Sequence, residues 1–247
     1  MTTPHDHIAA QLLNSKSLPV SSTWLSNFIA STAVQRHIPL SALTQTALFR
    51  VLASDFRDSL STGSRCSLLP VDIFGPTVQE RRLQGPIPVQ VLDIEDIGSS
   101  LWGQVEAIER VERGEAIRGR EIVRTVNVDE DPEQGANGAT ATATSGNARP
   151  SEVGNSTGPH RLIVQDAAGT RAVAIELKAI NGVALGKLAI GAKMLLRNAT
   201  VARGMVLLTP ECVTLLGGKI DALDQTWREG RKERLLARIT EMQTEQS

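Results

Sequence analysis

Apolar residues recur every three or four positions through the first sixty residues, which is the spacing of an amphipathic helix. In the third of these stretches Leu48, Val51, Leu52 and Phe56 fall on one face. Pro19 and Pro39 separate the stretches, because proline lacks the backbone N–H that continues a helix. The pattern predicts helices at residues 8–15, 21–32 and 40–60. We therefore expect an N-terminal three-helix bundle over residues 1–63.

The pattern changes after residue 63. Residues 64–88 are rich in Pro and Gly and predict an irregular connector. Short runs of Val, Ile and Leu then show partial alternation of apolar and polar positions, which is typical of strands. The runs predict five strands, at residues 89–97, 162–165, 171–179, 193–201 and 205–216.

Five strands and tight turns favour a small closed barrel. Ala167, Ala168 and Gly169 are short enough to join the second and third strands as a hairpin. The OB-fold, a five-stranded Greek-key barrel, has this strand count and closes on itself. We therefore expect an OB-fold barrel over residues 89–218.

A long insertion separates the first two predicted strands. It covers residues 98–159, far beyond the ~12 to 15 residues usual for a structureless loop in a compact domain. Its first part predicts a helix at residues 101–112, and residues 114–128 mix apolar and basic side chains. Residues 135–158 are almost entirely Gly, Ala, Thr, Ser and Asn, which bury too little apolar surface to fold. We expect that last part to be a flexible tether.

The chain returns to helical spacing after the barrel. Residues 219–242 predict a C-terminal helix, with a tail to residue 247, and Gly230 within it costs about 1 kcal/mol relative to Ala. The predicted fold class is therefore α+β: a three-helix bundle, an OB-fold barrel with an insertion between strands 1 and 2, and a C-terminal helix.

Catalytic motifs occur only in the wrong contexts. The string Gly-x-Ser-x-Gly at residues 154–158 lies in the predicted tether, whereas a nucleophile needs a sharp strand-to-helix turn. Residues 186–193, GKLAIGAK, approximate a phosphate loop but lack the Ser or Thr that binds magnesium. The four His and two Cys show no metal-ligand spacing. We expect no catalytic residues, no metal, no cofactor and no small-molecule substrate.

Composition limits the possible partners. The net charge is −1 and the pI about 6.4, which argues against binding that depends on a basic face covering phosphates. The chain has only two Cys, far apart in sequence, which fits a reducing compartment. No apolar run approaches ~18 residues and no leader pattern is present, so we expect a protein that is neither secreted nor embedded in a membrane. An OB-fold single-stranded DNA-binding protein is the alternative. Such proteins stack bases on aromatic side chains, and all seven aromatic residues fall outside the predicted strands.

Several strings resemble the RecQ-mediated genome instability protein 1 family, in its short, fungal-type form. They are VLASDFRDSLSTGSRCSLLPVDI at residues 51–73, VQVLDIEDIGSS at 89–100, GMVLLTPECVTLLGGKIDAL at 204–223 and RLLARI at 234–239. The resemblance implies a nuclear, non-catalytic subunit that binds the type IA topoisomerase III through its OB-fold and thereby joins a RecQ-type helicase. That complex dissolves double Holliday junctions, and DNA would be contacted weakly or through the complex. It also implies that a second C-terminal OB-fold, found in longer relatives, is absent.

The same resemblance assigns a role to the insertion, which in the family reaches into the topoisomerase gate and favours decatenation. A tolerated surface loop is the other interpretation of its length. Residues 114–128 are our candidate for the working part, and Lys193 is our candidate for docking because it lies at the turn before the fourth strand. The candidate partner-binding residues are Ile117, Arg118, Arg120, Ile122, Val123, Arg124, Val126 and Lys193.

Overall fold

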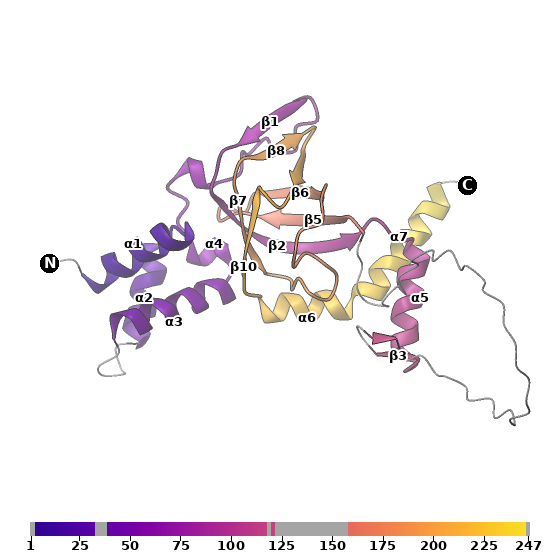
Figure 1. Ribbon diagram of the computed structural model, residues 1–247, viewed down its shortest axis with the longest axis horizontal. Coiled ribbons are helices and arrows are strands. Elements are labelled where there is room, and N and C mark those ends of the chain that lie inside the picture. The colour runs from indigo at the N-terminus through magenta and orange to yellow at the C-terminus, as the bar shows by residue number, and fades with distance from the viewer. Residues whose placement is uncertain (1–2, 33–38, 118–119, 122–157, 246–247) are drawn as a thin grey trace, which may run out of the picture.

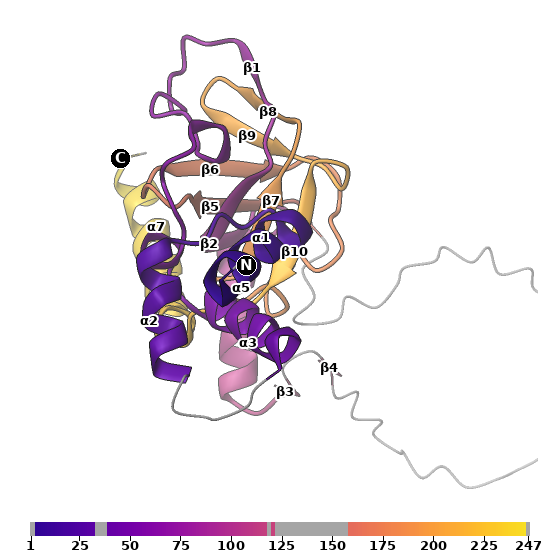
Figure 2. The same cartoon turned by 90° about the vertical axis from the view of Figure 1, so that its left-hand side faces the viewer.

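The computed structural model describes residues 3–32, 39–117, 120–121 and 158–245. Helices α1 (Pro4–Lys16), α2 (Ser22–Thr32), α3 (Leu40–Ala53) and α4 (Phe56–Ser59) form a bundle at one side of a curled sheet (Figure 1). The core shared by α1, α2 and α3 contains Ile8, Leu12, Leu25, Phe28 and Ala47. Figure 2 views the molecule from this bundle, with the sheet behind it.

The predicted helix at 40–60 is two helices, α3 and α4. Ser54 is extended, and its hydroxyl donates to the Val51 carbonyl at the end of α3. The Asp55 carboxylate then accepts from the Arg57 N–H at 2.9 Å and caps α4. These local hydrogen bonds, typical of Ser and Asp at helix ends, break a periodicity that continues through the apolar positions.

The barrel consists of β2 (Ile87–Asp96), β5 (His160–Gln165), β6 (Arg171–Glu176), β7 (Lys193–Leu196), β8 (Ala199–Ala202), β9 (Met205–Leu208) and β10 (Val213–Gly217). With β1 (Glu80–Leu83) the order of these described strands is β1-β8-β9-β6-β5-β2-β7-β10, in which only β6 and β9 run parallel. Strand β7 pairs with both β2 and β10, and β8, which follows β7 after residues 197 and 198, pairs with β9, so the sheet curls back on itself. The predicted OB-fold and the α+β class are confirmed.

Two predicted strands are divided in the structure. The strand at 193–201 splits into β7 and β8 because Asn198 adopts a left-handed φ of 50°. The strand at 205–216 splits into β9 and β10 at a turn in which the Cys212 N–H donates to the Thr209 carbonyl. The hairpin at residues 167–169 is confirmed, since β5 and β6 pair antiparallel around it.

The segment expected to be an irregular connector supplies a strand. Residues 64–88 contain the short 3₁₀ helix η1 (Arg65–Ser67) and β1 (Glu80–Leu83), which pairs with β8. Leu69, Ile73 and Leu83 belong to the barrel core. The prediction missed β1 because three of its four residues are charged, which hides the alternation of an edge strand.

The predicted helix in the insertion is confirmed as α5 (Leu101–Glu112), followed by the short pair β3 (Ala116–Ile117) and β4 (Arg120–Glu121). The predicted C-terminal helix divides into α6 (Asp221–Glu229) and α7 (Arg231–Glu245). The Arg234 guanidinium donates to the Trp227 carbonyl at 2.7 Å, next to the break at Gly230. Helices α5 and α7 pack together at the side of the barrel opposite the bundle (Figure 1).

Candidate partner-binding surface

Alternation along three barrel strands separates an inner from an outer set of side chains. Leu162, Val164, Ala172, Ala174, Val206 and Leu208 point inward and are buried. The intervening residues point outward, as strand geometry requires. We call these five aliphatic residues of β5, β6 and β9 the outer face: Ile163, Val173, Ile175, Met205 and Leu207.

Strand register makes the outer face continuous. Ile163 lies opposite Val173, which lies opposite Met205, and Ile175 lies opposite Leu207. Met205 is 38% exposed, and the other four are half-buried. A contiguous aliphatic surface of this kind, on the outside of a sheet, suits contact with a protein.

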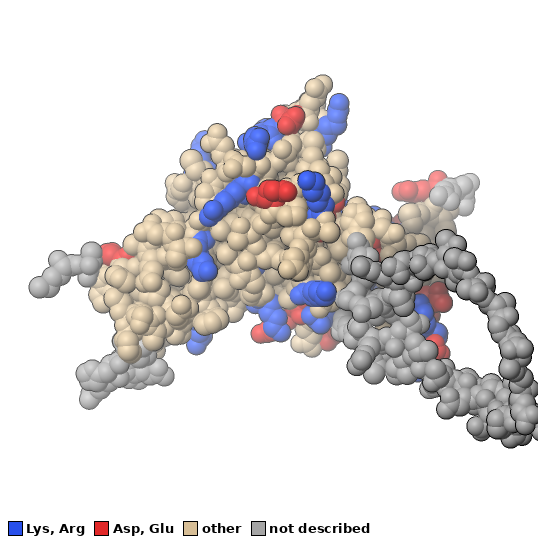
Figure 3. Space-filling model, in the orientation of Figure 1, with Lys and Arg blue, Asp and Glu red and all other residues tan. Residues whose placement is uncertain are grey.

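The described strands carry no Phe, Trp or Tyr, so the expectation that the aromatic residues lie outside the strands is confirmed for that part of the chain. Base stacking, worth about 1 to 3 kcal/mol per base, therefore has no platform on the outer face. Basic and acidic side chains both lie over the barrel, and Figure 3 shows one side of it. Arg82 and Arg171 are among the exposed basic residues.

The insertion leaves the barrel through a firmly held root where β2 ends and β5 begins. The Ile97 N–H donates to the Pro159 carbonyl at 3.0 Å, which joins its two ends. Asp96 accepts from the Gly98 N–H at 2.8 Å and from the Ser99 hydroxyl at 2.6 Å. Across the strand pair, the Glu176 carboxylate accepts from the His160 N–H at 3.1 Å and lies 2.6 Å from its ring Nδ1. These contacts fix the direction in which the insertion departs.

Helix α5 is held against α7 by ion pairs. Lys232 lies 3.2 Å from Glu109 and 2.7 Å from Glu112. Arg238 of α7 pairs with Glu95 of β2 at 2.7 Å. Trp102, in the first turn of α5, is 59% exposed. The start of the insertion is thus a rigid element that presents an aromatic side chain to solvent.

The structure covers only part of the sequence-predicted site in the insertion. Ile117 lies in β3 and Arg120 in β4, which pair with each other. Arg118, Ile122, Val123, Arg124 and Val126 lie outside the described residues. Their role in binding stays a prediction.

The expectation that Lys193 projects from the edge of the barrel is wrong. Its side chain is 0% exposed, and its ammonium group donates to Gln90 Oε1 at 2.9 Å and lies 4.6 Å above the Phe56 ring. All four residues of β7 are buried, because β7 lies between β2 and β10. Lys193 therefore cannot contact a docked partner. Its contacts are with buried neighbours inside the protein.

Lys193 belongs to a buried polar network at the seam between barrel and bundle. Gln90 Oε1 also accepts from the Phe56 N–H of α4 at 3.0 Å, and Gln90 Nε2 donates to Asp55 at 2.9 Å and to Gln165 at 3.2 Å. Burial lowers the pKa of Lys193 to about 7, and the Asp55 charge only partly opposes this. Burial raises the pKa of Asp55, but hydrogen bonds from Arg57 and Gln90 outweigh it and bring that pKa to about 2.

The sequence reasoning missed the outer face, although its signal was present. Alternation predicts each strand, and the outward positions of these strands are themselves aliphatic, which is the signal of a surface. Within the described ranges, no three His, Cys, Asp or Glu side chains gather as a metal site. No helix there has the length and apolar character needed to cross a membrane.

Comparison with known proteins identifies the fold. The model of the RMI1 N-terminal OB-fold domain matches residues 69–231, and that of the RMI1 N-terminal helical domain matches residues 12–59. The chain is also 26% identical over 212 residues to RecQ-mediated genome instability protein 1 of Schizosaccharomyces pombe, which covers 84% of this chain and 85% of that protein. The resemblance inferred from sequence strings is thereby confirmed: the chain belongs to the RMI1 family.

Proposed function

We propose that this protein is a non-catalytic scaffold and modulator subunit of a complex of topoisomerase III and a RecQ-type helicase. Membership in the RMI1 family supports a role in genome maintenance. The observation that carries the proposal is the continuous aliphatic outer face on an OB-fold whose described strands offer no base-stacking side chain. The complex would act in the nucleus on linked DNA strands and double Holliday junctions.

The two parts of the surface have different roles in this proposal. The outer face docks on the topoisomerase, where burial of Val173 and its neighbours supplies affinity at ~1.5 to 3 kcal/mol for a fully buried aliphatic side chain. The insertion, held at its root beside the same sheet, modulates strand passage. Residues 114–128 are its working part, and residues 135–158 are a spacer.

Replacing Val173 by Glu tests the docking surface. The charge would have to be desolvated in the interface, so we expect the affinity for purified topoisomerase III to fall more than ~10-fold. Val71→Glu is the matched control, since Val71 is 90% exposed and lies outside the barrel strands. Equal loss, or no loss, in the two folded variants would exclude the outer face as the docking surface. Circular dichroism and thermal unfolding establish that each variant is folded.

The insertion is tested in a decatenation assay with pure topoisomerase III. Deletion of residues 135–158 should leave binding and decatenation nearly unchanged. Replacement of the apolar and basic residues of 114–128 by Gly and Ser should impair decatenation more than binding. Equal effects of the two changes would contradict this division of roles.

Single-stranded DNA binding by the isolated protein separates this proposal from the alternative. Without stacking platforms, charge contributes mainly through counterion release, so we expect weak binding that falls steeply with salt. Titration of a labelled oligonucleotide at two salt concentrations measures this. Tight binding that barely responds to salt would favour a single-strand binder instead.

A further inference from the structure

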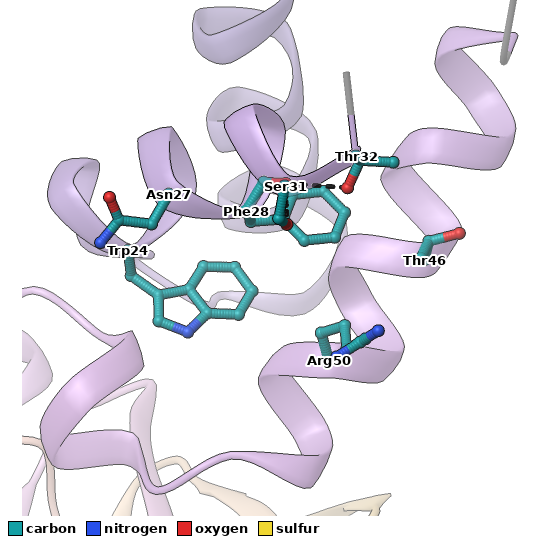
Figure 4. A pocket seen from close by; sticks show the side chains of 7 residues that line it. All are labelled: Trp24, Asn27, Phe28, Ser31, Thr32, Thr46 and Arg50. Atoms are coloured by element: carbon teal, nitrogen blue, oxygen red, sulfur yellow. Dashed lines mark hydrogen bonds between the residues drawn. The ribbon is translucent and has the colours of Figure 1, made fainter. Parts of the chain in front are cut away.

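Two helices of the bundle leave a hollow between them. Helix α1 lies close to both α2 and α3, whereas the backbones of α2 and α3 lie farther from each other. The hollow has a volume of about 630 Å³, and Figure 4 shows the side chains around it. Its walls are formed by Trp24, Asn27, Phe28, Ser31 and Thr32 of α2 and by Thr46 and Arg50 of α3.

The wall formed by α2 is aromatic. The Trp24 and Phe28 rings are stacked, with centroids 5.7 Å apart and planes 2° apart. Phe28 is buried, while Trp24 is half-buried and borders the hollow. On α3, Phe49 follows Thr46 by three residues and is 69% exposed. An aromatic wall with an exposed Phe nearby favours an apolar ligand.

The hydroxyl groups around the hollow are already satisfied by their own helices. Ser31 and Thr32 donate to the Phe28 carbonyl at 2.7 and 2.8 Å, and Thr46 donates to the Ala42 carbonyl at 2.9 Å (Figure 4 marks the first two). Because these hydroxyl groups already donate to backbone carbonyls, they do not require an acceptor on the ligand. The strongest polar group left at the hollow is Arg50.

Arg50 gives the hollow its charge preference. It is the one charged residue in Ser22–Thr32 and Leu40–Ala53 taken together. It is exposed and forms no ion pair with any residue that the structure describes. Among the described residues that line it, the hollow therefore presents one positive charge, without an ion-pair partner, next to an aromatic wall, and a carboxylate on the ligand would complement it.

We propose that the α2–α3 hollow binds an amphipathic helix of another protein that carries an aliphatic face and a carboxylate opposite Arg50. A helix is the ligand that fits a trough between two helices, because its own ridges can pack against both walls. Trp24 and Phe28 contact the aliphatic face, and Arg50 pairs with the acidic side chain. The site is separate from the outer face and does not depend on the function proposed for it.

Three synthetic peptides of about 18 residues, each about five helical turns, test the proposal. They share a leucine-bearing face and differ at one central position, which is Glu, Gln or Lys. Binding to the full chain is measured by the anisotropy of labelled peptide and by the NMR signal of the Trp24 indole. We expect affinity in the order Glu, Gln, Lys. In Arg50→Glu the order should reverse, with the Glu peptide weakened about 10-fold, which equals ~1.4 kcal/mol.

Lys16→Glu is the matched control, because it reverses an exposed charge on α1 away from the hollow. It should leave the order of affinities unchanged. The same order in wild type and Arg50→Glu would overturn the proposal, as would the absence of any Trp24 response up to ~1 mM peptide, where binding contributes only about 4 kcal/mol. A Trp24 response to single-stranded DNA, lost in Arg50→Glu and absent with every peptide, would also overturn it.

Discussion

Replacing Lys193 by Met should change how the stability of this protein depends on pH. The wild-type ammonium group is fully buried at the seam between barrel and bundle. Met keeps the length of the aliphatic stem and removes the charge. Since Gln90 Oε1 still accepts from the Phe56 N–H in the variant, the seam keeps its second hydrogen bond. We therefore expect Lys193→Met to fold.

The sign of the effect follows from the direction of the pKa shift. Burial lowers the pKa of Lys193 from its ordinary value of 10.5 to about 7 in the folded protein. Between these values the unfolded chain binds a proton that the folded protein does not, so the free energy of unfolding rises with pH. At ~1.4 kcal/mol per pH unit, the rise over the whole interval is at most about 5 kcal/mol. Below pH 7 Lys193 is protonated in both the folded and the unfolded protein. The free energy of unfolding is then lowered by the full cost of burying the ammonium group.

Urea unfolding at pH 7, 8 and 9 measures the effect. Wild type should gain ~2 kcal/mol relative to Lys193→Met over this range. Few other groups titrate there, since the chain has no Tyr and only two Cys. Lys187→Met is the control, because Lys187 is exposed and its loss should leave the pH profile parallel to that of wild type. Parallel profiles for wild type and Lys193→Met would refute the burial of a shifted lysine. The variant should also keep its affinity for topoisomerase III, because Lys193 does not reach the surface.

Two further predictions concern the C-terminal part of the chain. In urea titrations, Gly218→Ala should lower the free energy of unfolding by more than ~2 kcal/mol, and Gly217→Ala by only about 1 kcal/mol. Both glycines have φ near 80°, so Ala is strained at either position. Only a Cβ at position 218 would also clash with the Leu52 carbonyl. Similar losses at the two glycines would show that the clash is relieved at little cost. Trp227→Phe should cost ~1 to 2 kcal/mol, since its indole N–H donates to Asp93 at 2.6 Å, and the loss should be smaller in an Asp93→Ala background. Additive losses in that double-mutant cycle would contradict a direct interaction.

Local patterns predicted the fold well because most elements here have one apolar side. The helices over 21–32 and 101–112 and the hairpin around residues 167–169 follow directly from spacing and turn residues. Strand β1 was missed because its sequence, ERRL, satisfies its backbone through pairing with β8 and contributes only Leu83 to the core. Pairing with a strand more than a hundred residues away leaves no trace in a local pattern.

The error at Lys193 has the same origin. A lysine at the start of an apolar run is normally exposed, and burial almost always requires a partner. The partner here is Gln90, 103 residues earlier in the chain, whose amide is itself held by Asp55 and Gln165. Such an arrangement depends on three strands and a helix meeting at one point, and no spacing within the sequence reports it.

The seam around Gln90 also determines how the two proposed surfaces are placed relative to each other. Apolar contacts alone would leave the bundle free to slide on the barrel, because they are not directional. Gln90 accepts from the Phe56 N–H of α4 at 3.0 Å and donates to Asp55, the residue before that helix, at 2.9 Å. Both hydrogen bonds depend on angle and distance, so together they favour one orientation. These hydrogen bonds therefore favour one placement of the hollow between α2 and α3 relative to the outer face of the barrel. A partner that carries both a matching helix and a matching flat surface would bind the second site at a high effective concentration once the first is engaged.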